Sequence, residues 1–326
     1  MATLITLVIL TLSLIALLKG ADWLVDGASD LAAFFKVSPI IIGLTVVAFG
    51  TSLPELIVSL LAVFNGAADL SVANVVGSNF ANIGLGIGIA ALILPLRIKN
   101  KALIHEIPIL IVSSFLLLIL GTDQFIFQTN TFSLSRFDGV VLYIIFIMFC
   151  YYIWNSLQHK HPQEMHTDIE DEYIHDLPLW KSCTYIATGI TALFFGGKYF
   201  VEAAVQLAST FGLSEAFIGM TIVAIGTSAP ELITSFIAAH KGKGDLALSN
   251  IIGTNIFNIL FVLGSVSLLK PISIAPSLLV TDGIAMMALT LLFLVFVTRG
   301  KGISRYEGGT LAVLYLGYMA WMIMAL

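Results

Sequence analysis

The chain is divided into long apolar runs, and these runs constrain its fold more than any other feature. They lie at residues 2–24, 39–64, 71–95, 103–121, 137–157, 182–205, 214–240, 246–269, 278–298 and 307–325. Each is close to the roughly 20 residues that a helix needs to cross a bilayer. Charged residues make up only 11% of the 326 residues, whereas soluble domains carry about 25%. We therefore predict an all-α transmembrane protein with ten helices.

Basic residues are distributed unevenly between the two sides of this ten-helix arrangement. Successive loops lie on alternate sides of the membrane, and one set of loops holds twelve of the fifteen lysine and arginine residues. The other set holds only Arg136, Lys198 and Lys270. Because positively charged loops stay in the cytoplasm, we predict a cell-membrane protein whose N- and C-termini are outside and whose loop 158–181 is cytoplasmic.

The chain also contains an internal repeat. When the sequence is shifted by 176 positions, residues 37–88 align with residues 213–264 without a gap, and 24 of 52 positions are identical. Each half holds five predicted spans, and because five is odd, the second half enters the membrane from the opposite side. We predict two inverted five-helix repeats, residues 1–157 and 182–326, joined by the linker 158–181. Inverted repeats are typical of transporters that work by alternating access around a midplane site.

One short motif occurs in the middle of both the second and the seventh span. It reads Gly-Thr-Ser-Leu-Pro-Glu at 50–55 and Gly-Thr-Ser-Ala-Pro-Glu at 226–231. Proline lacks a backbone N–H and glycine tolerates unusual dihedral angles, so we predict that both helices are broken at the midplane by Gly50, Pro54, Gly226 and Pro230. Irregular backbone at this depth is tolerated where it lines a cavity. The carbonyl groups expected to be freed are those near Ala48, Thr51, Ala224 and Thr227.

Polar residues recur at helical spacing in four of the spans, as Thr51, Glu55 and Ser59; Thr227, Glu231 and Ser235; Asn74, Ser78 and Asn82; and Asn250, Thr254 and Asn258. A charge at the bilayer centre costs roughly 2.5–3.5 kcal/mol or more, so the two glutamates indicate a functional site. No lysine or arginine lies inside these spans, and no His or Cys joins the polar positions. Carboxylate, hydroxyl, amide and carbonyl oxygens are the ligands that hard cations prefer. Two unpaired carboxylates balance the charge of one divalent ion.

The paired motifs, GTS-x-PE and G-(S/T)-N-x-x-N, resemble the α-repeats of the cation/calcium exchanger superfamily, most closely those of its prokaryotic sodium/calcium exchangers. The resemblance covers both halves of the chain. The Ca²⁺/H⁺ branch typically has GN-x-x-E where this chain has GTSLPE and GTSAPE. The resemblance implies that Glu55 and Glu231 are the central ligands of Ca²⁺ and Na⁺. It adds oxygens of Thr51, Ser52, Thr227, Ser228, Ser78, Thr254, Asn82 and Asn258, and the carbonyls of Ala48 and Ala224.

One position departs from the pattern of several members of this superfamily. Asn258 lies where relatives that include K⁺-dependent exchangers have aspartate. An amide adds no third negative charge, so the resemblance implies a K⁺-independent exchanger. The ratio of Na⁺ to Ca²⁺ stays open, and so does the participation of a proton in place of, or beside, one Na⁺.

The predicted function is secondary active antiport of Ca²⁺ against Na⁺ by alternating access, with no enzymatic activity and no cofactor. Ca²⁺ and Na⁺ are the expected substrates and the lipid bilayer the expected surroundings, with neither nucleic acid nor an obligatory protein partner. Antiport of Ca²⁺ or Mn²⁺ against protons is the alternative. An intramembrane protease is disfavoured because its Gly-x-Gly-Asp motif, Gly-Lys-Gly-Asp at 242–245, is interpreted here as a turn. A channel is disfavoured because channels are usually rings of subunits around one pore, whereas this chain contains an inverted repeat.

Three other features have less specific interpretations. By the same resemblance, spans one and six are the predicted sliding element. The acidic residues and histidines of the linker are interpreted as a solvated connection, with a regulatory cation site or pH sensor as the alternative. The acids near span ends are interpreted as interfacial residues, with a cation vestibule as the alternative; they are Asp22, Asp26, Asp30 and Glu202.

Overall fold

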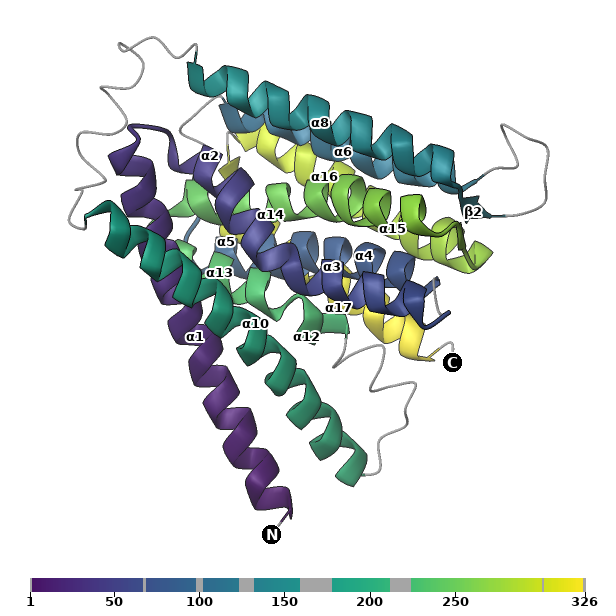
Figure 1. Ribbon diagram of the computed structural model, residues 1–326, viewed down its shortest axis with the longest axis horizontal. Coiled ribbons are helices and arrows are strands. Elements are labelled where there is room, and N and C mark those ends of the chain that lie inside the picture. Colours follow the sequence, from purple (N-terminus) through teal and green to yellow (C-terminus); the bar gives the residue numbers. More distant parts are fainter. Residues whose placement is uncertain are drawn as a thin grey trace.

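The structure is a computed structural model that describes residues 2–66, 69–97, 102–122, 132–158, 178–211, 224–300 and 302–324, nearly all of them helical (Figure 1). The first half contains α1 (Ala2–Phe34), α2 (Pro39–Ile42), α3 (Ala48–Phe64), α4 (Asp69–Ala81), α5 (Gly88–Ile93), α6 (Ala102–Gly121) and α8 (Arg136–Gln158). The second half contains α10 (Leu179–Thr210), α12 (Ala224–Thr227), α13 (Ala229–His240), α14 (Gly244–Ile256), α15 (Gly264–Leu269), α16 (Ile284–Gly300) and α17 (Arg305–Met324). Between several of these lie the π-helical turns η1 (Gly43–Val47), η2 (Asn82–Ile87), η4 (Phe257–Leu263) and η5 (Leu278–Gly283).

The described helices lie over the predicted apolar runs, although their ends differ. α1 extends to Phe34, well beyond the predicted end at residue 24. The extension includes Asp26, which is ion-paired with Lys241, as is Asp22 in the preceding turn. α10 likewise extends past both ends of the predicted run. The first part of run 214–240 and most of the predicted linker lie outside the described residues.

The surface of the bundle is apolar, while polar side chains are buried inside it. Leu4, Ile147, Met148 and Val313 are examples of large apolar side chains that are more than half exposed. The polar side chains that are fully buried include Thr51 and Glu55 of α3, Glu231 and Thr234 of α13, and Asn250 and Thr254 of α14. Six of the described helical segments are long and apolar enough to cross a membrane. This distribution suits a helical protein surrounded by lipid, in which polar residues face the interior of the bundle.

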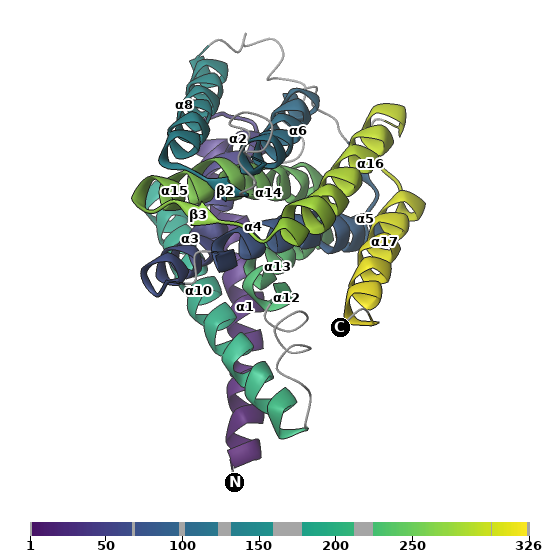
Figure 2. The same cartoon turned by 90° about the vertical axis from the view of Figure 1, so that its right-hand side faces the viewer.

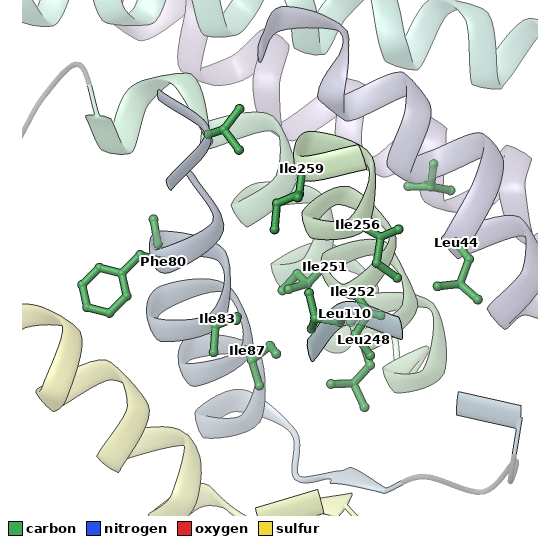
Figure 3. Packing of buried hydrophobic residues seen from close by; sticks show 14 of the residues in the cluster. Leu44, Phe80, Ile83, Ile87, Leu110, Leu248, Ile251, Ile252, Ile256 and Ile259 are labelled. Atoms are coloured by element: carbon green, nitrogen blue, oxygen red, sulfur yellow. The ribbon is translucent and has the colours of Figure 1, made fainter. Parts of the chain in front are cut away.

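The core lies around α14 and the helix formed by α4 and η2. Figure 3 shows Ile83 and Ile87 beside α14, which contributes Ile251 and Ile252 to the same cluster. Every residue from Leu246 to Ile256 is buried, because α14 also contacts α2, η1, α3 and α6. Polar residues on a helix that is enclosed in this way must bond to one another or to a ligand.

The predicted helix breaks differ between the two motifs. In the second half the helix is interrupted at Ser228, between α12 and α13. In the first half α3 continues through Gly50 and Pro54, so the break predicted there is wrong. A proline inside a helix removes one hydrogen bond and clashes with the turn before it, which can kink a helix without ending it. The irregular backbone of this half lies in η1, immediately before α3.

Two short antiparallel strand pairs connect the halves of the chain. β1 (Leu96–Arg97) pairs with β4 (Gly302–Ile303), and β2 (Ser133–Leu134) pairs with β3 (Ile272–Ser273), the second pair being visible in Figure 2. β1 and β3 lie 176 positions apart and are therefore equivalent in the repeat. Each pair thus joins a strand from one half to a strand from the other.

The loop between α13 and α14 confirms the turn predicted for Gly-Lys-Gly-Asp. Gly242 has a φ of +78°, and Gly66, its equivalent in the first half, has a φ of +82°. A positive φ of this size favours glycine because it has no Cβ. α14 begins at Gly244, so Asp245 lies in its first turn.

Candidate cation-binding site

One helix, α10, packs over both sequence motifs. A Cβ added to Gly50 would lie 2.5 Å from Cδ1 of Ile190, and one added to Gly226 would overlap Cγ2 of Val201. Ile190 and Val201 both belong to α10. The two motif glycines therefore allow α10 to approach the helices that carry the glutamates, a role that differs from the helix breaking predicted for Gly50.

The two motif glutamates are fully buried and have few hydrogen-bond partners. Ser78 Oγ donates to Glu55 Oε1 at 3.3 Å. Oε2 of Glu55 and both carboxylate oxygens of Glu231 accept no hydrogen bond within the described part of the chain. Two carboxylates that are both ionised in one buried site repel each other. Because an uncompensated buried charge is strongly unfavourable, this pair of carboxylates favours a bound cation.

Ser78 links the two halves of the site. Its hydroxyl contacts Glu55 of the first half, and it accepts a hydrogen bond from Ser228 Oγ at 2.9 Å. It also accepts one from Nδ2 of Asn258 at 3.3 Å. All four residues were predicted to belong to the site, and the structure brings them into one hydrogen-bonded group.

Thr51 makes a second connection between the halves. Its Oγ1 lies 3.3 Å from Oγ1 of Thr254 and 3.4 Å from Oδ1 of Asn250, both on α14. The same Oγ1 lies 3.3 Å from the carbonyl oxygen of Ala48. Thr51, Thr254, Asn250 and Ala48 are completely buried, whereas Thr227 is half-buried.

Four asparagines form a reciprocal network between α4–η2 and α14–η4. Nδ2 of Asn79 donates to the carbonyl of Asn255 at 3.1 Å, and Nδ2 of Asn255 donates to the carbonyl of Asn79 at 3.2 Å. In the same way Asn82 donates to Oδ1 of Asn255 at 2.9 Å, and Asn258 donates to Oδ1 of Asn79 at 3.1 Å. Asn79 and Asn255 were not among the predicted site residues. The signal that points to them is their identity at one position of the repeat.

The polar atoms left unpaired in this region are all oxygens. Asn82 and Asn258 use their amide nitrogens in the reciprocal network, so their Oδ1 atoms remain without a hydrogen bond in the described structure. The buried unpaired oxygens of the predicted site residues are Ser52 Oγ, Glu55 Oε2, Asn82 Oδ1, Asn258 Oδ1, and Oε1 and Oε2 of Glu231. Buried polar groups are normally paired, so these oxygens call for a ligand. A hard cation accepts such a set of oxygen ligands.

Two Asn–Ser pairs lie about one helical turn away from the glutamates, and in each pair the asparagine donates a hydrogen bond to the serine. Nδ2 of Asn74 lies 3.5 Å from Oγ of Ser59, and Nδ2 of Asn250 lies 2.9 Å from Oγ of Ser235. These two pairs occupy equivalent positions in the repeat. Because their side chains bond one another, they support the helices around the site and contribute fewer free oxygens to it.

Two of the acids near the span ends have a basic partner. Asp22 and Asp26 are both ion-paired with Lys241. Within the described segments, no group of three or more His, Cys, Asp or Glu side chains is placed to hold a metal ion. The candidate site is therefore two carboxylates surrounded by neutral oxygens.

The chain matches the family described as sodium/calcium exchanger protein over residues 5–155 and 181–324. It is 38% identical over 319 residues to the putative antiporter CaxA of Alkalimonas amylolytica, covering 97% of this chain and 98% of that protein. It is 33% identical to the sodium/calcium exchanger MaX1 of Methanosarcina acetivorans, covering 97% of each chain. The solved structure of the sodium-calcium exchanger NCX_Mj soaked with zero Na⁺ and Ca²⁺ matches with a TM-score of 0.82 at 30% identity, covering 98% of this chain and 99% of that chain.

The matched ranges contain both motifs and both buried glutamates. Each of these relatives aligns over nearly its whole length, and so does the solved structure. The family is one of transporters rather than enzymes. The chain therefore belongs to the sodium/calcium exchanger family.

Proposed function

We propose that the protein is a secondary active antiporter that exchanges Ca²⁺ for Na⁺ across the cell membrane by alternating access. The observation that carries this proposal is the pair of glutamates at equivalent repeat positions. Glu55 and Glu231 are fully buried, have no lysine or arginine in their own spans, and lie among unpaired oxygens of the described residues. The names of the relatives MaX1 and NCX_Mj, both sodium/calcium exchangers, support the choice of ions.

Glu55 and Glu231 bind the cations in this proposal, and neutral oxygens complete the coordination. These neutral ligands are the hydroxyls of Thr51, Ser52, Ser78, Thr227, Ser228 and Thr254, the side-chain oxygens of Asn82 and Asn258, and the carbonyls of Ala48 and Ala224. Support comes from the hydrogen bonds that connect Ser78 with Glu55 and Ser228. Further support comes from the unpaired oxygens of Asn82 and Asn258.

The charge of the site explains why transport is an exchange. Ca²⁺ and Na⁺ use overlapping oxygens and therefore compete. Bound Ca²⁺ or bound Na⁺ neutralises the two carboxylates. The neutral, occluded site can then move relative to the apolar part of the protein and change the side to which it opens. The empty site keeps two bare charges and moves rarely, because buried charges without partners are costly.

The architecture of this antiporter is ten helices in two inverted repeats, residues 1–157 and 182–326, with the linker 158–181 in the cytoplasm and both termini outside. Reciprocal hydrogen bonds between Asn79 and Asn255 support the repeat, since such bonds are typical of elements related by a two-fold axis. The antiparallel strand pairs between the halves support it as well. The uneven distribution of lysine and arginine supports the orientation.

The direct test is uptake of ⁴⁵Ca²⁺ into proteoliposomes that contain the purified protein. Vesicles are loaded with Na⁺, with K⁺, or with a buffer that creates a pH gradient. We expect uptake only when Na⁺ can leave the vesicles, and loss of uptake when an ionophore dissipates the Na⁺ gradient. Uptake that follows the pH gradient and ignores Na⁺ would contradict the sodium coupling and favour proton antiport.

The exchange is independent of K⁺ in this proposal, because Asn258 contributes no charge. The Asn258→Asp substitution removes the amide group that donates hydrogen bonds to Ser78 and Asn79. It also adds a third negative charge to the site. We expect that variant to change the Na⁺:Ca²⁺ coupling ratio or to make uptake depend on K⁺. The measurement is ⁴⁵Ca²⁺ uptake with and without K⁺ on the Na⁺ side. Asn65→Asp, an exposed position after α3, is the control, and identical coupling in all three proteins would remove the role given to Asn258.

A further inference from the structure

Lysines of the loop between α13 and α14 form ion pairs with acids of α1. Nζ of Lys241 lies 2.6 Å from Oδ1 of Asp22 and 2.7 Å from Oδ1 of Asp26. Nζ of Lys243 lies 3.5 Å from the same oxygen of Asp26. The side chain of Lys241 is only 25% exposed, so these contacts lie at a packed interface. We call Lys241, Lys243, Asp22 and Asp26 the lysine latch.

The lysine latch has no counterpart in the other half of the repeat. The residue equivalent to Asp22 is Lys198, and the residue equivalent to Lys241 is Asn65. Lys198 contacts the ring of its neighbour Tyr199, and within the described structure it forms no ion pair. At the latch, therefore, equivalent positions of the two halves carry different charges and make different contacts.

The helix that carries the acids is closely attached to α10. A Cβ added to Gly20 would lie 2.9 Å from Cβ of Ala192, and one added to Gly189 would lie 2.8 Å from the backbone nitrogen of Leu24. The backbones of α1 and α10 are thus in direct contact, and the two helices extend together beyond the bundle (Figures 1 and 2). Because α10 also covers both motif glycines, opening the candidate site to either end requires this pair to move over α3 and α13.

We propose that the lysine latch holds the α1–α10 pair against the α13–α14 loop and so favours the state in which this end of the transporter is closed. This role rests on the alternating access proposed above. Two inverted repeats of identical sequence would give two access states of equal energy, and an ion-pair cluster at one end only removes that balance. In the predicted orientation the latched end is cytoplasmic, so the favoured state opens to the outside.

Lys241 is charged at neutral pH in this arrangement. Burial lowers its pKa, but the hydrogen bonds and charges of Asp22 and Asp26 outweigh burial, and the pKa is raised overall. For Lys243, burial lowers the pKa more than Asp26 raises it. Lys241 is accordingly the centre of the latch, and its removal is the sharpest perturbation.

The test is thiol labelling of the full-length protein in membrane vesicles, with the exposed Cys150 and Cys183 replaced by serine. Ala239→Cys is the reporter at the latched end, and Val63→Cys is its repeat equivalent; both positions are 1% exposed. A membrane-impermeant maleimide is applied to each side. We expect Lys241→Gln to raise the labelling rate of the Ala239→Cys reporter about five-fold, equivalent to about 1 kcal/mol, the order expected for partly exposed ion pairs. The Val63→Cys reporter should not label faster.

Three controls make this result specific. Lys36→Gln removes a positive charge that lies just after α1 and forms no ion pair among the described residues, and it should label like the parent. Lys241→Arg keeps the charge and should also label like the parent. Adding Asp22→Asn to Lys241→Gln should cause no further change, because the two side chains act as one interaction; Asp22→Asn alone replaces Lys241→Gln if the latter does not fold.

Unchanged labelling in Lys241→Gln would overturn the latch, and so would equal increases at both reporters, which indicate general loosening. Labelling needs no transport, so the two proposals can fail separately. A protein that shows the one-ended change but no Na⁺-driven Ca²⁺ uptake would contradict the proposed ions and leave the latch supported.

Discussion

Replacing Glu55 or Glu231 by glutamine is expected to reduce Na⁺-driven Ca²⁺ uptake about 100-fold or more. With one carboxylate removed, a site loaded with Ca²⁺ keeps a net positive charge while it crosses the barrier. A charge at the centre of a bilayer costs roughly 2.5–3.5 kcal/mol, and each 1.36 kcal/mol of barrier lowers a rate about ten-fold. Glutamine is close in size to glutamate, so the loss of rate reports charge rather than packing.

The measurement is the initial rate of ⁴⁵Ca²⁺ uptake in proteoliposomes with equal amounts of each protein. Glu202→Gln is the matched control, because Glu202 is an exposed residue of α10, and it should retain the parent rate. Both glutamine variants should also elute as folded protein in size-exclusion chromatography. Normal uptake by either Glu55→Gln or Glu231→Gln would show that the candidate site is wrong.

Gly253→Ala is expected to destabilise the protein by about 1–3 kcal/mol, the usual cost of overpacking a core. A Cβ at this position would lie 2.8 Å from Cα of Leu44 and 2.8 Å from Cβ of Ala48. One of these atoms is backbone, so α14 can accept the methyl group only by moving away from η1 and α3. Such a movement would also separate Thr254 from Thr51, and uptake should fall with stability.

Gly77→Ala provides the internal comparison. Gly77 is the repeat equivalent of Gly253, yet a Cβ added there has no other atom within 4 Å. Alanine is the better helix former by about 1 kcal/mol, so this variant should be as stable as the parent or more stable. The readout is the melting temperature of the purified protein in detergent, and equal melting temperatures for the two variants would refute the packing difference.

Much of the fold follows from the apolar runs, because a bilayer permits few alternatives to a long helix. The described helices lie over those runs. The errors concern where helices end and where they break. α1 continues from its predicted end at residue 24 to Phe34, and Asp26, in this extension, is ion-paired with Lys241. Pro54 suggested a break, but α3 accommodates it.

The candidate site was predictable in its chemistry but incomplete in its members. Two glutamates without lysine or arginine in their spans stand out in an apolar sequence, since such charges are costly. Asn79 and Asn255 were left out of the predicted site although they belong to the repeated motif G-(S/T)-N-x-x-N, because the resemblance implied a ligand role only for Asn82 and Asn258. The structure separates the two kinds: Asn79 and Asn255 spend their oxygens on the cross-links between the halves, while Asn82 and Asn258 keep a free oxygen.

Residue order is enough to predict a helical membrane protein with one acid at the same mid-span position of each repeat, because hydrophobicity, charge and repetition can be read along the chain. The folded structure is needed to show that equivalent residues have different surroundings. A Cβ at Gly77 would meet open space where one at Gly253 would meet backbone. Asp22 is ion-paired with a lysine, whereas its equivalent Lys198 lies over the ring of Tyr199 and forms no ion pair among the described residues. Hydrogen-bond partners and packing neighbours depend on which helix lies opposite, and alignment of the two halves does not show that.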